Sequence, residues 1–320
     1  MVTDEEVPMI RSTIQLGEPR EHRGIVITPL FPLQAPVAAY LTLDEALPRG
    51  LVITEVSDAG DVPELSVDNP LDDRVLLYDG EELVGAKQNR ILNVTVLIEA
   101  KSILAIPVSC VEQGRWSSRS DHFDAARHLS HPELRRRKSA RLASAPLIRG
   151  LAQMEVWDEI ADKARRMQVA SPTSANADTF ESRAHALGAL EQAFPLEPGQ
   201  CGAVLALGDT LCLDWVSRPD AFALLWPKIR AGYLLDGLER LDQPPTPSEE
   251  VHRFVGKVAD ARITRRESAG LGDDVRLIAP DVTGSGLELD GELLQLSAFT
   301  TGETVQPPFG RVARPSRRRQ

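Results

Sequence analysis

Short segments rich in valine, isoleucine, threonine and leucine fill residues 24–112, and they constrain the fold more than any other feature. They follow one another at roughly ten-residue spacing, which is typical of the strands of a β-sandwich. The clearest of them are GIVITPLF (24–31), LVITEV (51–56), ELSVDN (64–69), RILNVTVLIEA (90–100) and SILAIPVSCVE (102–112). Turn-forming residues such as Asp79-Gly80 separate these segments. We therefore expect β-sandwich-like sheets in the N-terminal part of the chain.

The middle of the chain has a different character. The polar residues 116–129 predict a loop followed by a helical turn. The next clear pattern is an amphipathic helix within residues 155–169. Its apolar face is formed by Val156, Ile160, Ala164 and Met167. Residues 171–174, with the sequence SPTS, indicate the start of a further helix.

The C-terminal part combines strands and helices. GAVLALGDTLCLDWV (202–216) predicts a β-hairpin around Gly208-Asp209. Helices are expected within 219–241 and 251–261, and strands follow them. The predicted fold class is therefore α+β: N-terminal β-sandwich-like sheets, a central helical segment, and a C-terminal β-hairpin plus helices and strands. The expected organisation is an N-terminal segment (1–23), one globular domain (24–308; β-rich 24–116, helical 117–196, mixed 197–308) and a basic tail (309–320).

Composition excludes several classes of function. The net charge of −11 argues against general nucleic-acid binding, because phosphate binding needs concentrated lysine and arginine. Residues 1–20 resemble no secretory signal, and no apolar run approaches the ~18 residues of a membrane span. Three cysteines without a CxxC pair, and the absence of HExxH, favour reduced thiols in a cytoplasmic protein with no metal site. No cofactor is assigned, and a homo-oligomer is left open.

One polar stretch interrupts the predicted strands. Four consecutive polar residues occupy 87–90, and Asn93 follows them, where a strand would alternate polar and apolar side chains. A second interruption, at 112–116, ends the strand that begins at Ser102. Any chemistry of this chain is therefore expected between Gly80 and Trp116.

The side chains of this stretch suit a ligand that combines phosphate, amide and ring groups. Carboxylates serve acid–base chemistry or bind a ribose, cations bind phosphate, amides read the edge of a base, and an indole stacks on a ring. The catalytic candidates are Glu82, Lys87 and Glu112. The ligand-binding candidates are Gln88, Asn89, Arg90, Asn93, Arg115 and Trp116.

Structural explanations exist for the same residues. Glutamate–lysine and glutamate–arginine pairs across strands are common surface features that contribute little, and Gly80 and Gly85 suit a turn and a bulge. Cys110 follows an apolar run, which favours a buried thiol over a nucleophile. The basic run Arg135–Lys138 predicts a solvated helix face, or alternatively an anion-binding wall beside the polar stretch. The chain has no GxGxxG, GxxxxGK[ST] or GxSxG motif, so a Rossmann fingerprint, a P-loop and a hydrolase elbow are unsupported.

Several of these segments together resemble a known family. GEELVGAKQNRILN, IPVSCVEQGRW, VWDEIADKARRMQVASPT and the 202–216 hairpin before WPKIRAGYLLDGLE are similar to the prokaryotic domain associated with ADP-ribosylglycohydrolases and rhodanese-phosphatases. The resemblance covers residues 24 to 299 or so. It implies a role near NAD or ADP-ribose metabolism, and it supplies no catalytic residues.

Two hypotheses follow. The first is an enzyme that acts on an NAD-, ADP-ribose- or nucleotide-like small molecule by hydrolysis or transfer, with Glu82 or Glu112 as general base or ribose anchor. In it, Lys87 and Arg90 hold phosphate while Arg115 and Trp116 close the site. The second is a non-catalytic ligand-binding or scaffold module associated with ADP-ribose metabolism. Convergence of the polar side chains in one cleft would favour the enzyme, and a flat solvated face would favour the module.

Overall fold

Strands from both ends of the chain build the largest sheet. The computed structural model describes residues 10–57, 63–117, 119–144 and 149–301, so the predicted basic tail lies outside the described residues. The sheet has nine strands, and all of its pairings are antiparallel. Their order is β1 (Ile14–Leu16), β3 (Ile25–Pro32), β13 (Gly202–Leu207), β14 (Thr210–Val216), β18 (Glu292–Thr300), β17 (Val282–Leu289), β16 (Asp273–Ala279) and β15 (Arg262–Glu267), with β2 (Arg20–His22) also paired to β3.

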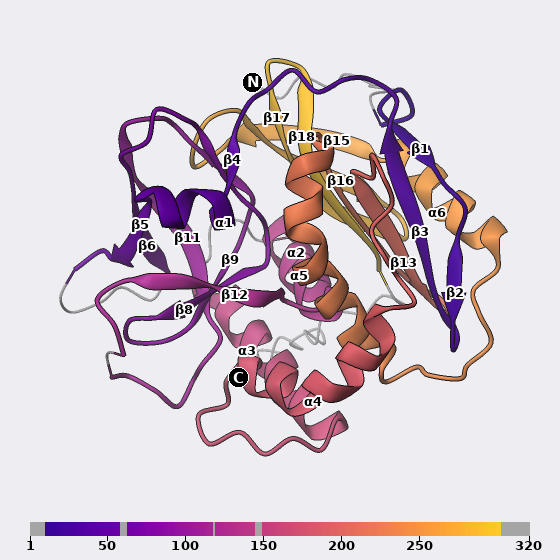
Figure 1. The fold of residues 1–320 in the computed structure, drawn as a ribbon, viewed down its shortest axis with the longest axis horizontal. Helices are drawn as coiled ribbons and strands as arrows, with labels where there is room; N and C mark the ends of the chain where they lie inside the picture. Colours follow the sequence, from indigo (N-terminus) through magenta and orange to yellow (C-terminus); the bar gives the residue numbers. More distant parts are fainter. Residues whose placement is uncertain (1–9, 58–62, 118, 145–148, 302–320) are drawn as a thin grey trace, which may run out of the picture.

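Helices cover both faces of this sheet (Figure 1). Alternation along β14 sends Leu213 and Trp215 to one apolar core and Cys212 and Val216 to the other. One face packs against α4 (Asn176–Glu191) and α5 (Pro219–Gly237), and the other against α6 (Ser248–Ala259). The predicted hairpin is confirmed, since β13 and β14 pair around Gly208, whose φ of 63° suits a tight turn.

The N-terminal strands form two further sheets. The six-stranded sheet runs β12 (Phe123–Leu129), β8 (Glu81–Gly85), β9 (Arg90–Leu92), β11 (Ser102–Cys110), β6 (Glu64–Asn69) and β5 (Val52–Glu55). The three-stranded sheet runs β10 (Val96–Ile98), β7 (Val75–Leu77) and β4 (Leu41–Thr42), and α1 (Leu43–Ala46) and the 3₁₀ turn η1 (Leu47–Arg49) follow β4. Side chains of both sheets share one apolar core, as expected of a sandwich-like layer pair. The predicted α+β class is confirmed.

Two helices lie between the nine-stranded sheet and the six-stranded sheet. They are α2 (Pro132–Ser144) and α3 (Arg149–Arg166). Of the predicted apolar face, Val156 and Ile160 are buried on α3, whereas Ala164 is half-buried and Met167 lies just beyond the end of the helix. Val156 and Ile160 pack with Ile91 of the six-stranded sheet and with Val111, which follows β11, so the helix lies beside the polar stretch. No helix among the described residues has the length and apolar character that crossing a membrane requires.

The prediction for residues 116–129 is partly wrong. In place of a helical turn, Phe123–Leu129 forms β12, which pairs with β8 at the edge of the six-stranded sheet. An irregularity in the pairing between Ala125 and Leu129 shifts the register. The buried side chains Phe123, Ala126 and Leu129 therefore recur at every third position, and the alternation that marks a strand is absent.

Candidate functional site

Strand pairing brings the two predicted polar clusters together. Residue 82 of β8 lies opposite Ile91 of β9, and Arg90 of β9 lies opposite Cys110 of β11. The turn after β8 and the segment after β11 therefore lie side by side. Glu82, Asn89, Glu112 and Arg115, far apart in the sequence, form one buried hydrogen-bonded cluster that we call the Glu82–Glu112 cluster.

Asn89 links the two carboxylates. Its side-chain Nδ2 donates to Glu82 Oε1 at 3.4 Å, and its backbone N–H donates to Glu112 Oε2 at 3.2 Å. Its Oδ1 accepts from Arg115 at 3.1 Å. One amide residue thus satisfies groups on three strands or loops, which fixes the spacing of both carboxylates.

Arg115 holds Glu112 as an anion. Its Nε donates to Glu112 Oε2 at 2.8 Å, and the same guanidinium donates to the backbone carbonyls of Ala86, Ser117 and Gly85. Burial raises the pKa of Glu112, but the hydrogen bonds and charge of Arg115 outweigh it, so the pKa lies below its ordinary value. A carboxylate held in this way is a poor proton acceptor and a good anchor.

Glu82 is surrounded by donors that the sequence did not indicate. Its Oε2 accepts from Asn176 Nδ2 at 2.7 Å and contacts His128 Nε2 at 3.0 Å. The His128 ring stacks on Phe180 with 3.8 Å between centroids, and its side chain is 11% exposed. An ionised carboxylate can only accept, so this contact requires the hydrogen on Nε2, and a neutral ring then has its lone pair at Nδ1. That Nδ1 makes no hydrogen bond within the described part of the chain.

A short backbone bridge places Asn176. Glu112 and Ala175 form an isolated antiparallel bridge, and the Gly114 N–H donates to Thr173 O at 2.8 Å. A β-carbon on residue 114 would lie 2.8 Å from the Thr173 Cα, so this close approach requires glycine. The predicted helix start at 171–174 therefore leads directly into the cluster, where α4 begins at Asn176.

Gln88, Arg90 and Cys110 form the deeper side of the cluster. Gln88 Oε1 accepts from Arg90 Nη1 at 3.1 Å and from Cys110 Sγ at 3.0 Å, while Gln88 Nε2 donates to Glu112 O. Arg90 lies 3.7 Å from a Glu55 carboxylate oxygen. Burial raises the pKa of the Cys110 thiol, so it lacks the thiolate character of a nucleophile.

Basic and aromatic side chains form the solvent-facing rim of the cluster. Trp116 is 51% exposed, and the Lys87 Nζ lies 5.7 Å from its ring centroid. Arg119 is 61% exposed and approaches Glu112 at 3.9 Å. We call these three residues the Trp116 rim. Asn93 lies apart from the rim, since its Oδ1 accepts from Ser109 on β11 at 2.8 Å.

The basic run on α2 is divided between core and surface, which corrects the prediction of a solvated face. Arg135 and Lys138 are buried, whereas Arg136 and Arg137 pair with Glu133 at 2.7 and 2.9 Å. Lys138 pairs with Asp79, so these cations are neutralised inside the protein. Among the described residues, no group of three histidine, cysteine, aspartate or glutamate side chains is arranged to hold a metal ion.

The chain matches one known protein family over most of its length. A family model described as the ARG and Rhodanese-Phosphatase-superfamily-associated Protein domain matches residues 13–299. The chain belongs to this family. The match includes every strand of the Glu82–Glu112 cluster, and it confirms the resemblance found in the sequence. The family's name links it to the ADP-ribosylglycohydrolase and rhodanese-phosphatase superfamilies. Searches of curated proteins and of solved structures gave no match.

Proposed function

We propose that this chain is an enzyme that hydrolyses, or transfers a group from, an ADP-ribose- or nucleotide-like small molecule, with His128 as general base. The observation that carries the proposal is the 3.0 Å contact between Glu82 and His128 Nε2, with Nδ1 left to accept a proton. A base oriented by a buried carboxylate is a recurring arrangement in hydrolytic sites.

The chemistry requires only the described side chains and water. Water attacks an electrophilic carbon or phosphorus atom of the substrate, and its proton passes to His128 Nδ1. The bond to the leaving group breaks, and the imidazolium returns the proton to that group. Glu82 stabilises the imidazolium, while Asn176 and Asn89 keep the carboxylate in place through hydrogen bonds of 2.7 and 3.4 Å.

The Trp116 rim supports the substrate class. An exposed indole offers a stacking surface for a base, and the neighbouring cations Lys87 and Arg119 suit the phosphates of a dinucleotide. In this proposal Glu112 anchors Arg115 and does not exchange protons, so the role of general base falls to His128. The family's association with ADP-ribosylglycohydrolases is consistent with this ligand chemistry.

One observation favours the alternative, a non-catalytic binding module. Glu82 and Glu112 are about 1% exposed and accept hydrogen bonds from protein donors, which suits a structural role equally well. The two functions differ in what His128 does. In a binding module it supports the fold or the ligand, and in an enzyme it moves a proton.

The test combines binding and turnover in the same variants. Thermal shifts with ADP-ribose, NAD and ATP should identify a ligand, and saturation at about 100 times its Kd should add about 2.7 kcal/mol of stability. Trp116→Ala should weaken that binding. His128→Asn should keep the binding and lose the release of product seen by chromatography, whereas His122→Asn, which changes an exposed histidine on the preceding loop, should retain both.

Each outcome has a consequence. Binding without turnover in the wild-type protein would establish the module and exclude the enzyme for these compounds. The absence of any thermal shift would exclude the substrate class itself. Equal turnover in His128→Asn would remove His128 from the mechanism.

A further inference from the structure

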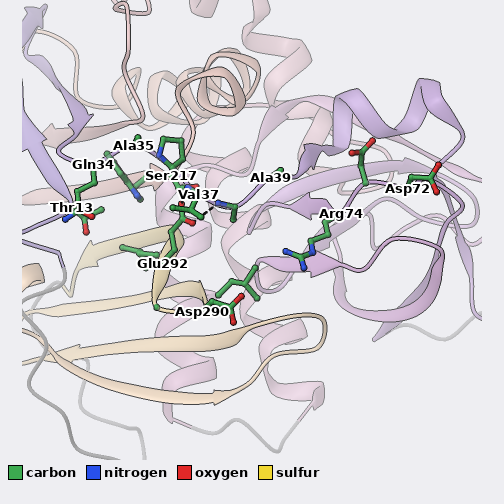
Figure 2. Close-up of a pocket in the computed structure, with 17 residues that line it drawn as sticks. Thr13, Gln34, Ala35, Val37, Ala39, Asp72, Arg74, Ser217, Asp290 and Glu292 are labelled. Atoms are coloured by element: carbon green, nitrogen blue, oxygen red, sulfur yellow. Dashed lines mark hydrogen bonds between the residues drawn. The ribbon is translucent and has the colours of Figure 1, made fainter.

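A second site is indicated by a cavity of about 610 Å³ between the nine-stranded sheet and the N-terminal sheets (Figure 2). Its walls are the loop before β4 (34–39), the loop before β7 (72–74) and the β17–β18 turn (289–293), and Trp215 also lines it. Small-molecule sites commonly enclose roughly 300–1,000 Å³ and often lie where two layers meet. None of the residues of the Glu82–Glu112 cluster lines this cavity.

One wall of the cavity is fixed in advance. The Glu292 carboxylate accepts the backbone N–H groups of Val37 and Ala38 at 3.1 and 2.8 Å. These charge-assisted bonds hold the 34–39 loop against the β17–β18 turn. A preformed wall lowers the entropy that a ligand must lose on binding.

Other polar groups of the cavity lack partners. The side chains of Arg74, Asp73 and Asp290 are exposed and form no hydrogen bond or ion pair with the described part of the chain. Figure 2 shows the Arg74 side chain extending toward the turn that carries Asp290. Trp215, in contrast, is only 1% exposed, and its indole Nε1 is buried with no acceptor among the described residues.

The charges define the kind of ligand. Asp73, Asp290 and Glu292 line the cavity against the single guanidinium of Arg74, whereas Asp72, the fourth acidic residue of the lining, pairs with Lys101 at 3.1 Å. This balance repels phosphates and favours a ligand with a net positive charge. Arg74 suits one carboxylate in bidentate fashion. Val37, 88% exposed at the edge, offers apolar surface for an aliphatic stem.

We propose that this cavity binds a free cationic α-amino acid, arginine or lysine. Arg74 receives the α-carboxylate, and Asp73 and Asp290 receive the cationic groups. An arginine or lysine residue within a peptide has the same side chain but lacks the free α-carboxylate, so Arg74 distinguishes the two sources.

Calorimetric titration of the full chain tests the proposal. L-Arginine or L-lysine should bind, L-glutamate should not, and L-argininamide should bind at least tenfold more weakly than L-arginine. Asp290→Asn should weaken the binding of L-arginine at least tenfold, because the charge is lost. Asparagine tolerates the left-handed φ of 50° at this turn, so the backbone should be unaffected. Asp281→Asn, an exposed aspartate paired with Lys257 at the preceding turn, is the matched control and should leave affinity unchanged.

The opposite results would overturn the assignment. These are no binding of L-arginine or L-lysine, unchanged affinity in Asp290→Asn, or preference for L-glutamate. Equal binding of L-arginine and L-argininamide would exclude the free amino acid. Arg74→Ala should bring the affinities of L-arginine and L-argininamide together, and a persisting difference would contradict the role given to Arg74.

Discussion

Arg135 and Asp214 form a bidentate ion pair in the interior, with Nη1–Oδ2 at 2.8 Å and Nη2–Oδ1 at 2.7 Å. The pair joins α2 to β14 of the nine-stranded sheet, and both side chains are fully buried. Tyr78, which follows β7 of the three-stranded sheet, donates to the same carboxylate at 2.7 Å, so the network links α2 to both of these sheets. Burial raises the pKa of Asp214, but the charge and hydrogen bonds of Arg135 outweigh it and hold the pKa below its ordinary value.

Removal of this buried charge should destabilise the protein strongly. Asp214→Asn leaves the buried Arg135 cation with only Asp79, which lies 3.7 Å away and already pairs with Lys138. Breaking a buried pair in this way typically costs about 3–5 kcal/mol. Urea unfolding followed by circular dichroism measures the loss. Asp260→Asn is the control, because its pair with Arg11 is exposed and should contribute less than about 1 kcal/mol. Equal effects of the two changes would show that the buried pair contributes no more than a surface pair.

Glu133 should make stability depend on acid pH. Burial raises its pKa, but hydrogen bonds and charge from Arg136 and Arg137 outweigh that effect and hold the pKa at about 2, against 4.5 for the free group. The folded pKa is depressed, so the stabilisation is fully present above the unfolded value and is lost as pH falls from 4.5 toward 2. The shift corresponds to roughly 3 kcal/mol at most.

The comparison with Glu133→Gln isolates this group. Wild type should be the more stable protein at neutral pH by urea unfolding, and the difference should shrink through the acid window. A difference that stays constant down to a pH of about 2.5 would contradict the prediction.

Regular patterns in the sequence were sufficient for most of the fold. The strand segments of 24–112, the hairpin at Gly208 and the apolar face of α3 all appear in the structure, because each depends on local alternation or helical periodicity. The proximity of Glu82 to Glu112 does not follow from such local patterns, since it depends on β9 pairing with both β8 and β11.

Local sequence patterns do not indicate that His128 and Asn176 belong to the site. The register shift in β12 removes the alternation that identifies a strand. The sequence therefore does not indicate that His128 lies on a strand paired with β8. Asn176 reaches Glu82 across 94 residues of sequence through the bridge at Ala175. Similarly, Arg135 has the charge of a surface residue, and only its partner Asp214, 79 residues away, explains its burial.

The thiols should be inert in the folded protein. Cys110, Cys201 and Cys212 are at most 1% exposed, and burial raises their pKa values, to about 12 for Cys201. Because the thiolate is the reacting species, Ellman's reagent should modify none of them in buffer and all three in concentrated urea. Cys110→Ser should retain any turnover. Rapid modification of one thiol in the native protein would show an opening that the structure lacks.

Glu82→Gln tests whether the carboxylate orients His128 or merely supports the fold. The amide of glutamine can donate to Nε2, which favours the opposite tautomer and removes the proton-accepting lone pair from Nδ1. Turnover of ADP-ribose, NAD or ATP, whichever the wild type consumes, should then fall by roughly 10²–10⁴-fold. Affinity for the same compound should change little, because the Trp116 rim is unaltered.

Two measurements separate this role from a loss of structure. The unfolding midpoint reports the cost of altering the buried contact with Asn176. The pH–rate profile should lose its acid limb, the fall in rate at low pH, only if the proton acceptor has been disabled. Glu181→Gln, an exposed glutamate on α4, is the matched control and should retain full turnover. If Glu82→Gln kept wild-type turnover while its midpoint fell, Glu82 would be structural, and the dyad with His128 would have no part in catalysis.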